Sequence, residues 1–450
     1  MPTLSDISQT GSAKTACSMA DVAHITHLLR RTEYVAKPDR VAYLAGLSLA
    51  AAIDDILAVP SNDIVLPSSL TVRNVAQNQQ QQAALTQWWL DRMIEAPKPL
   101  AEKMTFFWHG HFVSGMTKVN EAFLLARQNR LYRSHALGNF HDLTQAMALD
   151  PAMLLYLDNA DNESGSPNQN FARELMELFT LGVGNYTEAD VEAAAAAWTG
   201  YGINRTTFAF EYHADLHDDS LKLFMGVVPA ARWTGPQIID HILLPNSATA
   251  LITAKFVVTK LWEYFAYQSP SPAVVDPLAT GFATDWNIKS LLKALFMRSE
   301  FYSVSALQGM VRNPVEWVVA VMYQLGVRSA QLTPDQHLAA MGQDPLDPPN
   351  VSGWRPNGYW VNTSTMGARS TFARNAALVA PFSNLVNVSA MTIDGAIDAV
   401  CNRYDLQPIS AVTRSAMTVL VSSQRAAQPG TWESLNLTTL AMICPEMQAI

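Results

Sequence analysis

The stretch Asn168–Thr187, with the sequence NQNFARELMELFTLGVGNYT, indicates the fold class more clearly than any other part of the chain. On a helix that turns by about 100° per residue, its apolar and polar side chains separate onto two faces. The apolar face consists of Phe171, Leu175, Leu178 and Phe179. The polar face consists of Asn170, Arg173, Glu174 and Glu177. The pattern predicts an amphipathic helix that ends near Gly182, because glycine suits a helix C-terminus.

The polar face of this helix has two interpretations. If it meets solvent, Arg173 and Glu177 form an ordinary ion pair four residues apart. If it is buried, Glu174 and Glu177 can bind a cation or divide acid and base roles between them. The sequence leaves both interpretations open.

The helical period recurs in Gln79–Ala96, Leu100–Trp108, Ser247–Tyr267 and Ile288–Met297. Asp150, Asn313 and Thr333 each precede a proline, which is the arrangement of an N-cap followed by the first helical residue. Only Thr207–Tyr212 places aromatic residues at every second position, the period of a strand. The predicted fold is mainly α, a large multi-helix globular unit with a minor β hairpin or arm near residues 206–212.

Length and composition predict a large buried core. The chain has 450 residues, of which 49% are hydrophobic and 15% are charged. We expect an N-terminal tail over residues 1–19, a helical core unit over 20–380, and a C-terminal helical segment over 381–450 that packs on the core.

Several classes of partner lose support from the charge and the motifs. The net charge of -9 gives no basic footprint, so we expect no nucleic-acid partner. No run reaches the roughly 18 apolar residues of a membrane span, and the first 19 residues lack a secretory signal, which favours a cytoplasmic location. Three scattered cysteines do not form a disulfide framework. Phosphate-binding and dinucleotide-binding glycine motifs are absent, so neither a nucleotide nor a flavin is expected.

A pair of histidines in Phe106–Phe112 is a candidate metal-binding feature. In a continuous helix His109 and His111 would point roughly 200° apart, whereas a bend at Gly110 would let them converge. Histidines among aromatic residues are more often buried core residues than ligands. The pair therefore needs acidic residues from elsewhere to form a metal site.

The segment His213–Asp219 could supply them, because it carries two histidines and three carboxylates. His217 and Asp218 form the kind of adjacent pair that orients ligands and general bases, and Lys222 could neutralise a carboxylate or contact an anion. A polar surface turn is the alternative. Farther along, Asp344–Asn362 has too many prolines and glycines for a helix, and its Trp354 and Trp360 predict an ordered loop packed over a pocket.

At these segments the chain resembles DUF1800, a bacterial family of proteins of unknown function. The resemblance rests on motifs that follow one another in the family's order over roughly residues 20–375 and that fade after about Phe382. They are HLLRR (27–31), FWHGHF (107–112), MLLYLDN (153–159), NQNFARELMELFTLGVGNYT (168–187), HDDSLKLFMG (217–226), NPVEW (313–317) and PPNVSGW (348–354).

The resemblance implies no particular reaction. Members of the family resemble exported proteins and are often encoded beside a second family similar to alkaline phosphatases or sulfatases, which is a possible protein partner. Two features depart from the family pattern. The chain shows no export signal, and Gln169 stands where members often carry Glu, which weakens a carboxylate-rich site.

These observations lead to three hypotheses about function. The first is an enzyme that performs metal-assisted hydrolysis or oxidation on a small-molecule or polymer substrate in a buried pocket. The second is a non-catalytic binding or assembly module with a structural polar network. The third is a metal-free glycan-active enzyme, which ranks last because Glu174 and Glu177 share one side of a helix whereas glycosidase carboxylates flank the bond.

The first hypothesis assigns roles to particular residues. The candidate catalytic residues are Glu174, Glu177, His217, Asp218 and Arg173. The candidate substrate-binding residues are Trp108, Asn170, Lys222, Asn350 and Trp354. The candidate metal ligands are His109, His111, Glu174, Glu177 and His217. Imidazole and carboxylate ligands would suit zinc, iron or manganese.

Overall fold

The computed structural model describes residues 20–60, 64–406, 408–427 and 431–450. These residues form 22 α-helices and one small antiparallel sheet, so the prediction of a mainly α fold is confirmed. The predicted tail over residues 1–19 lies outside the described residues. None of the helices built by the described residues combines the length and apolar character needed to cross a bilayer.

The first twelve helices are α1 (Val22–Thr32), α2 (Pro38–Ala45), α3 (Leu49–Leu57), α4 (Asn78–Glu95), α5 (Leu100–His111), α6 (Met116–Val119), α7 (Ala122–Ser134), α8 (Phe140–Ala148), α9 (Pro151–Tyr156), α10 (Asn170–Glu174), α11 (Glu188–Ala197) and α12 (Gly235–Ile242). The two strands are β1 (Tyr201–Ile203) and β2 (Phe210–Tyr212). The remaining helices are α13 (Ala248–Phe265), α14 (Pro272–Phe282), α15 (Ile288–Phe296), α16 (Pro314–Leu325), α17 (Pro334–Ala340), α18 (Thr363–Val379), α19 (Ile393–Arg403), α20 (Ala411–Ala427), α21 (Thr431–Ile443) and α22 (Pro445–Gln448).

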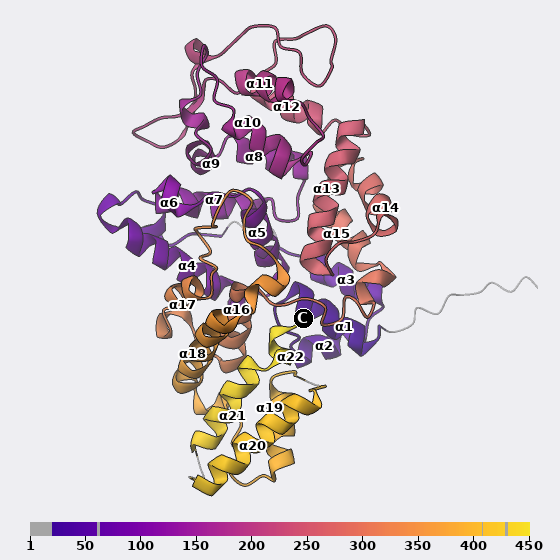
Figure 1. Ribbon diagram of the computed structural model, residues 1–450, viewed down its shortest axis with the longest axis vertical. Coiled ribbons are helices and arrows are strands. Elements are labelled where there is room, and N and C mark those ends of the chain that lie inside the picture. Colours follow the sequence, from indigo (N-terminus) through magenta and orange to yellow (C-terminus); the bar gives the residue numbers. More distant parts are fainter. Residues whose placement is uncertain (1–19, 61–63, 407, 428–430) are drawn as a thin grey trace, which may run out of the picture.

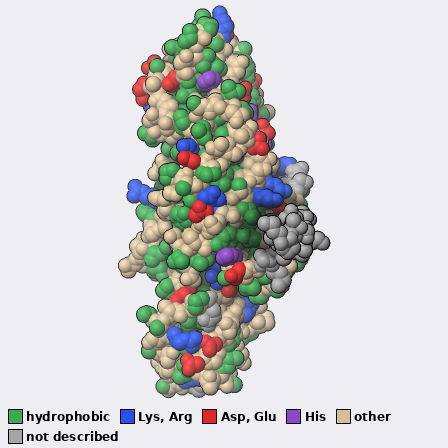
Figure 2. Space-filling model, turned by 90° about the vertical axis from the view of Figure 1, so that its right-hand side faces the viewer, with side chains coloured by type: hydrophobic (Ala, Val, Ile, Leu, Met, Phe, Trp, Pro, Cys, Tyr) green, Lys and Arg blue, Asp and Glu red, His purple; other side chains and the backbone are tan. Residues whose placement is uncertain are grey.

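The molecule is elongated, with helices α8–α12 at one end and α18–α21 at the other (Figure 1). Its buried side chains form two hydrophobic clusters. One joins α1–α3 with α8 and α11–α15, and the other joins α4 and α7 with α16–α21. Helix α5 contributes to both clusters, since Phe107 packs in the first and Phe106 in the second. Figure 2 shows one face of the molecule, on which basic and acidic side chains are interspersed with no broad field of one sign.

Helices α5 and α16 form the centre of the molecule. Every residue of α5 except Gly110 is buried, and every residue of α16 except Tyr323 is buried. A helix that is covered on all sides normally carries only apolar residues. These two nevertheless carry charges, which therefore need partners inside the protein.

The buried charged residues of α5 are paired with charged residues of α7 and α16. Both carboxylate oxygens of Glu102 accept hydrogen bonds of 2.8 Å from the guanidinium of Arg133 on α7. The ammonium of Lys103 lies 3.0 Å from Glu316 on α16. The second pair joins the two central helices.

The strand is predicted at the right place but over too many residues, because the aromatic alternation begins at Thr207 whereas β2 begins at Phe210. Tyr201, Gly202 and Ile203 pair with Tyr212, Glu211 and Phe210. Residues 204–209 form the connecting turn, in which Phe208 adopts a positive φ of 55° and packs edge-on against Phe123. The aromatic alternation thus continues past the true start of the strand, because Phe208 finds its apolar contact outside the sheet.

The helix predicted at the start of Asn168–Thr187 is shorter and changes its winding. Residues Asn170–Glu174 form an α-helix, and Leu175–Phe179 continue it as a π-helical turn. The carbonyl of Met176 accepts a bond of 2.9 Å from the amide of Leu181, five residues later. The wider turn leaves the carbonyls of Leu178 and Phe179 free to accept hydrogen bonds from side chains.

The capping predictions hold at two of three positions. Asp150 accepts from the amide of Met153, and Asn313 accepts from the amide of Glu316, as N-caps do. Thr333 precedes α17 but adopts a positive φ of 43° and makes no capping bond, so this prediction is wrong.

Arg133→Met should strongly destabilise the protein. Glu102 would remain buried without its partner, and breaking a buried pair in this way costs about 3–5 kcal/mol. Arg92, at 3.9 Å, could compensate only in part. The free energy of unfolding from urea titration measures the effect. Arg173→Met, which breaks the exposed pair with Glu188, is the control and should change little; equal losses for both variants would contradict the argument.

Candidate functional site

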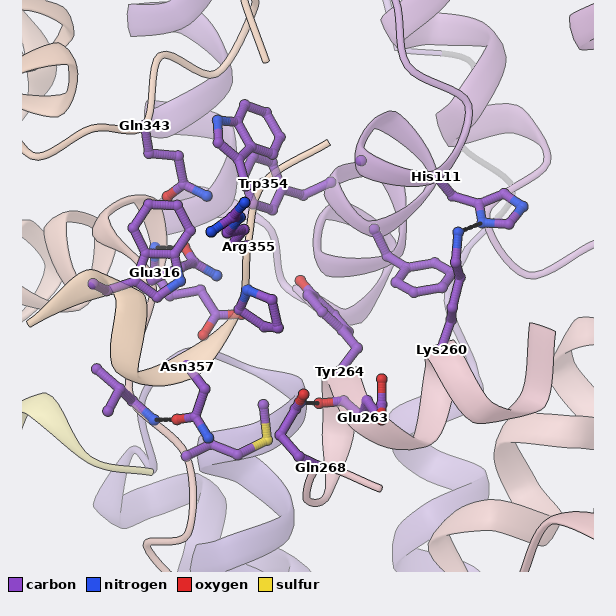
Figure 3. A pocket seen from close by; sticks show the side chains of 18 of the residues that line it. His111, Lys260, Glu263, Tyr264, Gln268, Glu316, Gln343, Trp354, Arg355 and Asn357 are labelled. Carbon is purple, nitrogen blue, oxygen red and sulfur yellow. Dashed lines mark hydrogen bonds between the residues drawn. The ribbon is translucent and has the colours of Figure 1, made fainter. Parts of the chain in front are cut away.

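A cavity of about 260 Å³ lies where α5, α13, α16 and the segment 343–360 meet. Its walls come from parts of the chain that are far apart in sequence (Figure 3). Three of the motif segments contribute to it, namely those that begin at Phe107, Asn313 and Pro348. The lining residues are Phe106, Phe107, Gly110, His111, Lys260, Glu263, Tyr264, Gln268, Met310, Val311, Asn313, Glu316, Gln343, Ser352, Trp354, Arg355, Pro356, Asn357 and Trp360.

Helix α13 places three functional side chains on this cavity. Lys260, Glu263 and Tyr264 are three and four residues apart, so they share one face of the helix. The Lys260 ammonium lies 4.5 Å from the centre of the Phe256 ring, one turn earlier on the same face. Glu263 is tied down at the end of the helix, where it accepts from the amide of Ser269.

Lys260 is held by neutral groups. Its Nζ donates to the carbonyl of Leu178 at 3.0 Å and lies 3.4 Å from Nδ1 of His111. Among the described residues no Asp or Glu lies within ion-pair distance of this ammonium. Figure 3 shows Lys260 beside His111, across the cavity from Glu316 and Gln343.

The tautomer of His111 follows from its contacts. Nε2 lies 3.0 Å from the carbonyl of Phe179, which can only accept, so Nε2 carries the hydrogen. Nδ1 is then the acceptor and faces Lys260. Burial, together with the nearby charge of Lys260, holds the pKa of His111 well below its usual range. His111 therefore stays neutral and accepts a hydrogen bond from the ammonium.

The amine of Lys260 opens onto this cavity, and its pKa is shifted toward neutral pH. Burial lowers its pKa to about 8, although the charge of Glu263 acts in the opposite direction. A lysine in water has a pKa of about 10.4, so the protein makes the neutral amine far more accessible near neutral pH.

The opposite wall is anchored by the pair between Glu316 and Lys103. The charge of the Glu316 carboxylate also stabilises the protonated forms of Arg31 and Arg312 and so acts to raise the pKa of both. Burial nevertheless lowers the pKa of Arg31 to about 9 and that of Arg312 to about 10. The single carboxylate of Glu316 is thus surrounded by several buried cations.

The segment that closes the cavity is fixed by close packing on α5. The indole of Trp354 stacks on Phe106 with ring centres 5.5 Å apart and an angle of 17°. Gly353 has a φ of +78°, and a Cβ there would lie 2.6 Å from the carbonyl oxygen of Gly110. The predicted ordered loop over a pocket therefore corresponds to this wall.

The candidate ligand histidines of α5 diverge. The helix continues through Gly110 to His111, so the two rings leave it in different directions. His109 donates from Nε2 to the carbonyl of Pro345, and burial lowers its pKa to about 4. Its ring packs between Trp354, at 5.6 Å, and Tyr132, at 5.8 Å. His109 is a buried structural histidine, whereas His111 reaches the cavity.

The carboxylates of the Asn168–Thr187 stretch lie at other places. Glu177 accepts a hydrogen bond of 2.7 Å from the hydroxyl of Tyr186. Glu174 is partly buried in a separate cavity of about 520 Å³, and burial together with the charge of Glu177 raises its pKa. Asn170 lines the same cavity and donates to Asp158. Arg173 is paired with Glu188.

The residues of the 213–222 segment form a cluster of their own. His217 Nδ1 lies 2.8 Å from the carbonyl of Thr199, and the amide of Asp218 donates to the hydroxyl of the same threonine. Lys222 is buried and donates to the carbonyls of Asp218 and Ser220. Its ammonium also lies 3.6 Å from the carboxylate of Asp218, so Lys222 neutralises a carboxylate, as one of the two sequence-based expectations had it.

The predicted metal ligands are therefore not gathered at one place. Within the described residues no group of three or more His, Cys, Asp or Glu side chains is arranged to hold a metal ion. Each of the three histidines is bound to a different backbone carbonyl, and Glu177 is bound to Tyr186.

Of the proposed substrate-binding residues, Trp354 lines the cavity of α5 and α13. Trp108 is fully buried and donates from its indole to the carbonyl of Ala136, which leaves it no surface for a ligand. Asn350 is exposed and accepts from the amide of Ser352 in a turn. Sequence reasoning missed Lys260, whose only signal is a basic residue within the apolar stretch of Ser247–Tyr267.

The fold and this site define a helical protein with a lysine-containing internal pocket. Residues 27–449 match the model of the family described as "Protein of unknown function (DUF1800)", and the chain belongs to that family. The match extends through α19–α22, so the C-terminal helices are part of the family's common region although the motif resemblance fades near Phe382. No curated protein and no solved structure matches the chain.

Gly353→Ala should destabilise the wall of the cavity. The new Cβ would overlap the Gly110 carbonyl in a left-handed backbone conformation, so we expect a loss of at least about 2 kcal/mol. Gly358→Ala in the same segment is the matched control, because a Cβ there meets nothing within 4 Å. Urea titration of both variants tests this, and equal stability would show that the close approach does not constrain the segment.

His109 should make the protein less stable in acid. Its pKa is about 4 in the folded protein and about 6.5 in the unfolded chain, so between these values the unfolded chain binds the extra proton. The contribution of His109 to the free energy of unfolding should fall by about 3 kcal/mol as the pH drops through this window. His109→Gln keeps a donor for Pro345 but does not titrate. Its unfolding free energy should fall less than that of the wild type, and parallel pH profiles would refute the assignment.

Proposed function

We propose that the protein is an enzyme whose active site is the cavity of α5, α13 and α16, with Lys260 as the general base. The single observation that carries the proposal is an amine with a pKa of about 8 that opens onto a cavity and has neutral hydrogen-bond partners. Amines, imidazoles and carboxylates act best as bases when their pKa lies near the working pH.

The low pKa changes what Lys260 can do. At pH 8 about half of such amines are neutral, whereas for a lysine in water fewer than about 1% are. His111 and the Leu178 carbonyl orient the nitrogen, and the proton that Lys260 takes up gives an ammonium that these two acceptors already accommodate. The step is thus removal of a proton from a bound substrate by Nζ.

The cavity suits a small organic substrate or one end of a larger one. Aromatic rings of Phe107, Tyr264 and Trp354 offer flat apolar surfaces. The side-chain amides of Gln343 and Asn357 offer N–H donors, since their oxygens accept from backbone amides. A volume of about 260 Å³ lies just below the usual range for small-molecule pockets.

The earlier hypotheses compare as follows. Metal-assisted chemistry lacks a ligand group among the described residues, so the proposal rests on Lys260 and not on a metal. The glycan hypothesis needs Glu174 and Glu177 to flank one bond, but they lie three residues apart on one helix; Glu174 lines the cavity of about 520 Å³, and Glu177 accepts a hydrogen bond from Tyr186. A non-catalytic binding module is the second candidate, supported by the structural contacts of His109, and it does not require an unusual amine.

Competitive amine labelling followed by mass spectrometry tests the proposal without a known substrate. The pH dependence of acetylation at Lys260 should give a pKa of about 8. Lys255 is the internal reference, since it is on the same helix, half-exposed, and paired with Asp276. A pKa above about 10 for Lys260 would eliminate the general-base proposal and leave the binding-module hypothesis.

Glu263→Gln should lower the pKa of Lys260 further. The carboxylate stabilises the ammonium, so its removal should shift the labelling curve to lower pH by up to about one unit. Glu192→Gln, an exposed change on α11, is the control and should leave the curve in place. An unshifted or raised pKa in Glu263→Gln would mean that the two side chains do not interact as the structure places them.

A further inference from the structure

We infer that the ligand of the Lys260 cavity carries an oxyanion, a carboxylate or a phosphate, that is held by Arg355. The inference names the substrate class for the site proposed above and rests on that proposal for the role of the cavity. The observation behind it is the distribution of charged side chains around the cavity.

Arg355 is a guanidinium without an anionic partner. It is exposed, lines the cavity, and lies 5.9 Å from the centre of the Tyr359 ring. No Asp or Glu of the described residues forms an ion pair with it. Other surface arginines do have such a partner; Arg328, for example, is paired with Glu95. The backbone of Arg355 lies next to Trp354, whose ring is stacked on Phe106 of α5.

The same cavity holds a second basic side chain, Lys260, which also has no carboxylate of the described residues within ion-pair distance. Figure 3 shows the two side chains on opposite sides of the cavity, with Arg355 beside Trp354 and Lys260 beside His111. A ligand that spans the cavity would meet one cation at each end.

Two carboxylates also line the cavity, Glu316 and Glu263, and neither is paired with Arg355. Glu316 is paired with Lys103 at 3.0 Å and is further compensated by Arg31 and Arg312 behind it. Two side-chain nitrogens of Arg31 and one of Arg312 are buried without hydrogen-bond partners, so this wall has cationic groups in excess. Glu263 lies at the end of α13 and accepts from a backbone amide.

The geometry of the groups selects the kind of anion. A guanidinium presents parallel donors that match the paired oxygens of a carboxylate or a phosphate. The aromatic walls formed by Phe107, Tyr264 and Trp354 favour a flat apolar group attached to that anion.

Three probes of similar shape test the inference: benzoate, phenyl phosphate and the uncharged benzamide. Protection of Lys260 from acetylation measures occupancy of the cavity. We expect benzoate or phenyl phosphate to bind at least about tenfold more tightly than benzamide, which corresponds to 1.4 kcal/mol. The tighter of the two anions identifies the carboxylate or the phosphate as the preferred group. Equal protection by benzamide would overturn the inference.

Arg355→Met is the test variant, since it removes the charge at an exposed position and should leave the fold intact. It should lose the preference for the anions over benzamide. Arg205→Met is the charge-matched control, because it removes an exposed arginine of the hairpin turn that is paired with Asp161. This variant should keep the preference for the anions. Anion binding that survives in Arg355→Met would also overturn the inference.

The two proposals fail separately. If Lys260 titrates near pH 8 but no anion is preferred, the general base stands and the oxyanion site does not. If Lys260 titrates above about pH 10 while Arg355 still selects the anions, the anion site stands and the general base does not.

Discussion

The ion pair between Lys103 and Glu316 is the contact on which the arrangement of the molecule depends. It joins α16 to α5, two helices that are covered on nearly every side, and α5 contributes to both hydrophobic clusters. Withdrawing two charges from water is unfavourable unless the partners are held in good geometry. The pair therefore fixes the relative position of the central helices, and with it one wall of the cavity that Glu316 lines.

The sequence predicted the helical fold well, because helical periodicity and capping are local signals. It failed where the deciding contact comes from a distant part of the chain. Nothing near His111 in sequence indicates that its partners are Lys260 and Phe179. Charge and residue type suggested that His217 would join the α5 histidines, but its ring is bound to the carbonyl of Thr199. Lys260 became a candidate only when its burial was known, since burial sets its pKa.

The segment 343–360 serves two cavities at once. Pro348, Pro349 and Val351 line the cavity that contains Glu174, while Ser352 and the residues after it line the cavity that contains Lys260. One irregular stretch, held against α5 by Trp354, is thus a common wall. Irregular segments tolerate such a role when close packing fixes them, and they place more side chain types at a site than a helix face could.

The π-helical turn at Leu175–Phe179 makes the site dependent on chain length as well as on side chains. Its last carbonyls, those of Leu178 and Phe179, receive the ammonium of Lys260 and the ring of His111. A π turn contains one residue more than the α turn it replaces. Deletion of a single codon here would restore regular winding, rotate both carbonyls away from α13 and α5, and leave every residue that faces the cavity unchanged. A one-residue deletion in this helix would therefore abolish the site without any substitution of a residue that lines the cavity.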